Sequence, residues 1–272
     1  MARRGQSDNW GMATMAATTA QKHRKKQSEW LGIGAGNSYY HRVHRPLQCL
    51  IFISPLLLLY QIGSTIQPWD SRGQAPENVL AFVKMLRFFH WFGANGSWLP
   101  MFAVVAILLA WHVARRDPWE FQPKLYALMG LEGLAWSIPM ITMGLVLARN
   151  AGLSAPTLSN FPWQTQVVLS IGAGVYEEFV FRLVAITVLN LILIDIFELK
   201  PQAALPVIIL TSAVMFSLYH YGGNEPFAWN TFFFRTAAGI FFAGVFIFRG
   251  FGITVAAHAF YDLIVVALTL KR

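Results

Sequence analysis

Long apolar segments separated by short polar stretches dominate the chain after its first 45 residues. Several of these segments run for about 18 residues or more, which is long enough for a helix to cross a ~30 Å hydrocarbon layer. The pattern predicts membrane helices over these segments: 46–66, 98–114, 124–148, 163–197, 204–220, 230–248 and 252–270. We therefore expect an all-α, polytopic integral membrane protein with seven to eight membrane-embedded helices.

One segment, 163–197, is too long for a single straight crossing, because a helix of this length would extend for about 52 Å. The glycines at positions 172 and 174 predict a kink or a break within it. A break there would place Glu177 and Glu178 in the first turn of a new helix, which Pro201 would stop.

A second segment, 77–93, is short and carries Lys84, Arg87 and His90. We expect it to form an amphipathic helix along the outer interface. With the N-terminus cytoplasmic, this placement puts most basic loop residues on the inner side, as the positive-inside rule favours, although the terminal Lys271 and Arg272 then lie outside.

Composition supports a membrane protein, since 56% of residues are hydrophobic and only 12% are charged, against about 25% charged in soluble domains. The net charge of +8 arises mostly in residues 1–45, which contain eight Lys and Arg residues but two acidic ones. We interpret this segment as a disordered basic cytoplasmic tail near anionic lipid, with a transit peptide as the alternative. The charge therefore predicts the lipid bilayer, and no nucleic acid, as a partner.

Ionisable side chains inside the apolar segments are the candidates for chemistry, because such groups cost several kcal/mol at membrane depth. In "GVYEEFVFRL", residues 174–183, Glu178 and Arg182 are four residues apart and can form an ion pair. That pair would leave Glu177 without a partner. Glu132 lies in another apolar segment, and we expect it to be neutral, paired across helices or lining a channel.

Two further apolar segments carry histidines. "FSLYH" ends at His220, and in "HAFYD" His258 and Asp262 share one helix face, so that Asp262 can orient the imidazole. A carboxylate that holds water and two histidines are the parts of a hydrolytic site, with Glu177 as general base. Each piece alone is readily explained by packing or by an interfacial position, whereas packing explains the combination less easily.

These polar groups form three motifs that resemble those of a known family. EExxxR at 177–182, FxxxH at 216–220 and HxxxD at 258–262 are similar to the motifs of the CPBP family (CAAX prenyl protease and bacteriocin-processing proteins, also called Abi) of intramembrane proteases. The order and approximate separation of the motifs agree, and the resemblance covers about residues 163–270.

The resemblance implies a glutamate-dependent, metal-independent endopeptidase without a cofactor. It implies that Glu177 activates a water molecule and that His220 assists it. His258 and Asp262 would bind the carbonyl oxygen of the scissile bond. The substrate would be a peptide or protein within or at the membrane, and residues 46–272 would form the protease domain.

The same resemblance implies that Glu178, Arg182 and Phe216 support the motifs. Two positions depart from the family pattern: Leu183 replaces a common glycine, and Asp262 replaces the asparagine of the branch that processes prenylated proteins. An ionised aspartate cannot donate a hydrogen bond to an oxyanion, so Asp262 would orient His258 instead or stay protonated. This departure weakens the expectation of CAAX cleavage and fits a prokaryotic branch of the family, with a plasma (inner) membrane location.

Two other functional classes compete with this interpretation. Two histidines and a glutamate could bind zinc, but HExxH is absent, and the lone Cys49 allows no cysteine-based metal site. Alternatively, the charges could form a structural network in a membrane scaffold, an immunity protein or a transporter. No oligomeric state is predicted.

The expected topology places the two histidines at different depths. His258 would lie ~9 Å and His220 ~24 Å along their helices from the inner side. The two can share a site only if some segment enters the membrane obliquely or is offset in depth.

Overall fold

The computed structural model describes residues 38–66, 79–151, 161–223 and 225–270, in which the regular elements are helices and no strand occurs. The α-helices are α2 (Tyr39–Val43), α3 (Pro46–Ile66), α4 (Leu80–Trp91), α5 (Leu99–Arg115), α6 (Pro123–Ala151), α7 (Trp163–Gly172), α8 (Ile186–Asn190), α9 (Pro201–His220), α10 (Trp229–Arg249) and α11 (Phe251–Thr269). The all-α prediction is therefore confirmed.

The chain divides into two units, residues 1–42 and 43–272, and the helices discussed below belong to the second. Of the expected tail, residues 1–37 lie outside the described residues. The division into a tail of residues 1–45 and a protease domain of residues 46–272 therefore stays a prediction.

Six of the described helices are long and apolar enough to cross a membrane. They span Pro46–Ile66, Pro123–Leu147, Trp163–Ile196, Pro201–His220, Trp229–Arg249 and Phe251–Thr269. This confirms a polytopic membrane protein, while the count of seven to eight embedded helices stays a prediction. Helix α5 is apolar but shorter, and α4 has 12 residues, or roughly 18 Å, which is too short to cross alone.

The segment Trp163–Ile196 forms one continuous helix, so of the kink or break expected near residues 172–174, the break is wrong. The helix instead contains π-helical turns at Ala173–Glu177, Phe179–Ala185 and Leu191–Ile196. Such turns widen the helix and often occur at functional sites. Glu177 and Glu178 consequently lie in the middle of a long helix and not in a first turn.

The two glycines in this helix allow neighbouring helices to come close. A Cβ at Gly174 would lie 2.8 Å from the backbone nitrogen of Ala259 and 3.0 Å from the carbonyl oxygen of Val255, both in α11. A Cβ at Gly172 would lie 2.2 Å from the ring of Tyr60 in α3. The absence of side chains therefore serves packing between helices.

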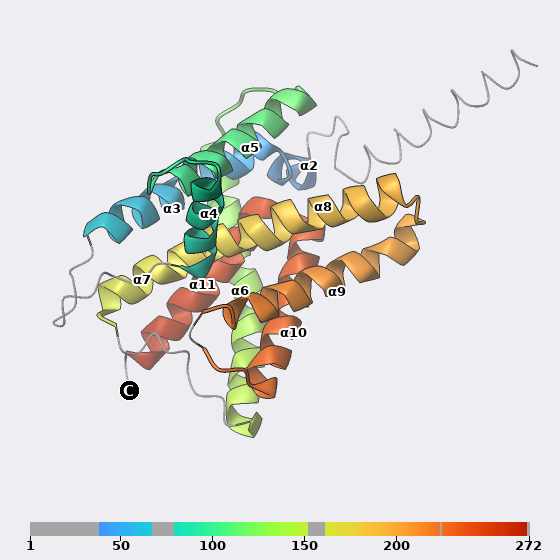
Figure 1. Ribbon diagram of the computed structural model, residues 1–272. Helices are drawn as coiled ribbons and strands as arrows, with labels where there is room; N and C mark the ends of the chain where they lie inside the picture. The colour runs from blue at the N-terminus through green and yellow to red at the C-terminus, as the bar shows by residue number, and fades with distance from the viewer. Residues whose placement is uncertain (1–37, 67–78, 152–160, 224, 271–272) are drawn as a thin grey trace, which may run out of the picture. The chain divides into compact units, whose positions relative to one another are not determined.

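Helix α11 occupies the centre of the bundle, where it packs against α3, α6, α7 and α10. Its first half, from Phe251 to Ala259, is buried throughout. Figure 1 shows α8 and α9 side by side and running obliquely to α6 and α10, while α7 lies against α11. This oblique arrangement brings the C-terminal end of α9 toward the middle of α11.

Candidate active site

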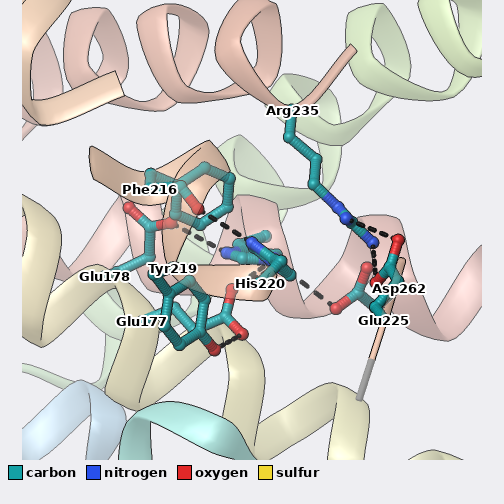
Figure 2. Close-up of polar contacts among 9 residues, drawn as sticks. Glu177, Glu178, Phe216, Tyr219, His220, Glu225, Arg235 and Asp262 are labelled. Atoms are coloured by element: carbon teal, nitrogen blue, oxygen red, sulfur yellow. Dashed lines mark hydrogen bonds and ion pairs between the residues drawn. The ribbon is translucent and has the colours of Figure 1, made fainter. Parts of the chain in front are cut away.

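Glu177 lies where three helical segments meet, with only 6% of its surface exposed. Its Oε1 accepts a hydrogen bond from the Tyr219 hydroxyl at 2.5 Å. Its Oε2 lies 3.9 Å from Nε2 of His220 and 4.0 Å from Nε2 of His258. The carboxylate expected to be the base therefore faces both expected histidines, and Figure 2 shows Glu177 beside His220.

The close approach of α11 positions His258. Val255 and Ala259, which flank His258 on α11, are the residues that contact the backbone at Gly174. The imidazole lies parallel to the ring of Phe242, with a centroid distance of 4.7 Å and an interplanar angle of 16°. One helix face and one aromatic ring thus fix the plane of His258.

Two carboxylates in addition to Glu177 contact His258. Its Nδ1 lies 2.8 Å from Oε1 of Glu178, and because a carboxylate accepts, Nδ1 carries the proton. Its Nε2 lies 3.5 Å from Oδ2 of Asp262. We expected Asp262 to orient this imidazole, and it does contact the ring, but the shorter contact comes from Glu178.

Glu178 also forms the expected pair with Arg182, since Oε2 lies 3.1 Å from the arginine Nε. Both side chains have no exposed surface. The guanidinium carbon lies 4.7 Å from the centre of the Phe216 ring, which is a cation–π contact. The first two motifs are therefore joined through Arg182 and Phe216.

A hydrogen bond within its own helix determines the tautomer of His220. Its Nδ1 lies 2.8 Å from the carbonyl oxygen of Phe216, and because a carbonyl only accepts, Nδ1 donates the proton. In the neutral ring, Nε2 is then an acceptor, and this atom faces Glu177. Phe216 thus contributes to the site through its backbone as well as its ring.

Three polar residues in or near the site were not predicted from the sequence. Tyr219 bonds directly to Glu177, and its only signal is its position before His220 in "FSLYH". Arg235 of α10 makes two hydrogen bonds to Glu225, at 2.8 and 2.9 Å. Figure 2 shows this pair near His220. No motif includes Glu225 or Arg235, and no regular spacing connects them.

No group of three or more His, Cys, Asp or Glu side chains within the described ranges is placed to hold a metal ion. Cys49 is buried in α3 and has no disulfide partner.

Comparison with known proteins gives a family match to the motif-bearing segment. Searches of the curated proteins and of the solved structures found no match. A protein-family model described as type II CAAX prenyl endopeptidase Rce1-like matches residues 159–264, a range that includes the three motifs. Residues 159–264 are therefore similar to the Rce1-like type II CAAX prenyl endopeptidases, in agreement with the family that the motifs resemble.

Proposed function

We propose that this protein is an intramembrane endopeptidase in which Glu177 activates a water molecule for attack on a peptide bond. The observation that carries the proposal is the position of Glu177 Oε2, at 3.9 and 4.0 Å from the two histidine Nε2 atoms. The family match supports peptidase chemistry in the same part of the chain.

These two distances fit a shared water molecule. Both exceed the length of a direct hydrogen bond, which ends near ~3.5 Å. Two hydrogen bonds of about 2.8 Å that meet at a right angle on one water separate their outer atoms by about 4.0 Å. One water can therefore bridge Glu177 to either imidazole, and we place it in contact with both.

The proposed reaction uses this water as the nucleophile. The carboxylate of Glu177 takes one proton while Nε2 of His220 accepts a hydrogen bond from the other O–H, which orients the water oxygen. The oxygen attacks the carbonyl carbon, and the protonated Nε2 of His258 donates to the resulting oxyanion. Glu177 then gives its proton to the leaving nitrogen as the C–N bond breaks.

The remaining motif residues hold the imidazole of His258 in place. Glu178 accepts a hydrogen bond from Nδ1 of His258 and pairs with Arg182, which lies over the Phe216 ring. Asp262 contacts Nε2 of His258 from the other side. In this account Asp262 orients the imidazole and contributes no hydrogen bond to the oxyanion.

We propose membrane-associated or C-terminally anchored peptides and proteins as substrates. The family description names prenylated CAAX ends, which supports a lipidated C-terminus as the first candidate. C-terminal sorting tails and secreted peptide precursors are the other two. We further propose that residues 46–272 act as the protease domain in a prokaryotic plasma (inner) membrane, with the basic tail in the cytoplasm.

A comparison of native membrane proteomes tests this proposal. Mass spectrometry would compare cells producing the wild type, the Glu177→Gln variant and the Glu120→Gln variant, whose glutamate is 43% exposed and pairs with Arg45 outside the site. We expect an uncleaved C-terminal precursor to accumulate only with Glu177→Gln. Identical profiles for all three proteins would refute the proposal.

The metalloprotease and non-enzymatic alternatives need a reconstituted assay. One arm of the assay gives the full chain in proteoliposomes a peptide that ends in a prenylated Cys-aliphatic-aliphatic-X sequence. A second arm gives it the precursor that accumulated in cells. The substrate that is cleaved is called the test substrate below. Cleavage that persists in EDTA but is lost in Glu177→Gln supports the glutamate mechanism, whereas inhibition by EDTA supports a metal site. Folded Glu177→Gln and His220→Gln proteins with full biological activity would support a structural network.

A further inference from the structure

We infer that Tyr219 is a positioning residue for the proposed reaction: its hydroxyl holds Oε1 of Glu177 and thereby leaves Oε2 facing the two imidazoles. This inference rests on the proposed function. Position 219 is a variable position of the FxxxH motif, so the motif itself assigns it no role.

Aromatic packing fixes the tyrosine ring from three sides. Its centroid lies 4.9 Å from that of Phe181, 4.4 Å from that of His220 and 6.4 Å from that of Phe216. Because the ring cannot turn freely among these neighbours, the hydroxyl has a defined position. At this position it donates to Glu177 at 2.5 Å (Figure 2).

The direction of this hydrogen bond follows from its acceptor. An ionised carboxylate has no proton to donate, whereas a phenol hydroxyl has one. The Tyr219 hydroxyl therefore donates its proton to Oε1 of Glu177.

The hydrogen bond from Tyr219 therefore gives the two carboxylate oxygens of Glu177 different roles. The terminal torsion of a glutamate side chain is soft, and without a fixed partner the carboxylate samples many orientations. A donor on Oε1 restricts this rotation. Oε2 then stays close to both Nε2 atoms, where the attacking water is expected to bind.

The Tyr219→Phe variant tests this role, because it removes the hydroxyl and keeps the ring. We measure kcat and KM of the full chain in proteoliposomes with the test substrate, together with the thermal unfolding midpoint. The matched control is Tyr126→Phe, which removes a hydroxyl bonded to Gln48 Oε1 at 2.7 Å, away from the site.

We expect kcat of Tyr219→Phe to fall by about 10- to 100-fold, the usual effect of losing a hydrogen bond to a charged group. KM should stay within about twofold, since the hydroxyl is not proposed to contact substrate. The unfolding midpoint should change no more than in Tyr126→Phe, whose kcat should match the wild type.

An unchanged kcat would overturn the inference. So would a fall in kcat that merely follows a lower midpoint, since that pattern describes a structural residue. These outcomes are distinct from failure of the proposed function, because Glu177→Gln would still abolish cleavage. Cleavage by Glu177→Gln itself would refute both.

Discussion

Glu178 connects two of the three motifs through its two carboxylate oxygens. One oxygen contacts Nδ1 of His258 at 2.8 Å, and the other lies 3.1 Å from Nε of Arg182. The pair with Arg182 could be predicted because residues four apart on a helix are neighbours. The contact with His258 joins positions 80 residues apart, and only the packing of α11 against the π-helical turn creates it.

Removing the charge of Glu178 should therefore destabilise the protein. Glu178→Gln leaves Arg182 without a counter-charge at a site with no exposed surface, and breaking a buried pair in this way costs about 3–5 kcal/mol. Glu120→Gln, where the glutamate side chain is 43% exposed, should cost less than about 1 kcal/mol. Denaturant unfolding in detergent measures both, and equal losses would contradict the structural role given to Glu178.

At the scale of helices, the apolar pattern predicted nearly every element. The observed bounds of α3 to α6 and of α9 to α11 lie within a few residues of the expected ones, because apolar runs end at prolines, glycines and charged residues. The exception is the long helix Trp163–Ile196, which continues through the glycines expected to break it. A sequence shows that a glycine lacks a side chain, but not which helix lies against it.

Gly174→Ala tests the close approach of α11 to this helix. The added Cβ would meet backbone atoms of Ala259 and Val255 at 2.8 and 3.0 Å, and such overpacking costs about 1–3 kcal/mol. Because α11 carries His258 between these residues, we also expect kcat to fall. A Cβ at Gly244 in α10 would meet nothing within 4 Å, so Gly244→Ala is the control. Equal activity of the two variants would contradict the proposed packing role.

For the bundle as a whole, the site depends on helices that cross one another obliquely. Counting along straight helices placed His220 and His258 at different depths, yet both lie within 4.0 Å of the Glu177 carboxylate. The oblique path of α9 across α10 accounts for the difference (Figure 1). Motif residues could be predicted because each is unusual in an apolar segment, whereas Tyr219 could not, because a tyrosine is ordinary near the end of such a helix.

A second charged pair lies apart from these motifs. Glu132 of α6 forms an ion pair with Arg249 of α10, whose Nη2 donates to Oε2 at 2.9 Å. Of the three outcomes expected for Glu132, pairing across helices is the one observed. Among the described residues, an ion pair therefore joins α6 to α10 and is separate from the polar cluster in which the proposed chemistry takes place.

The central claim is that Glu177, His220 and His258 act as one unit on one water molecule. The most direct test is kcat for Glu177→Gln, His220→Gln, His258→Gln and the triple variant, measured with the test substrate in proteoliposomes. Residues that act as a unit have strongly non-additive effects. We predict that each single change lowers kcat at least about 100-fold and that the triple variant is no slower than the slowest single variant. Losses that multiply in the triple variant, or a wild-type kcat in Glu177→Gln, would contradict the account.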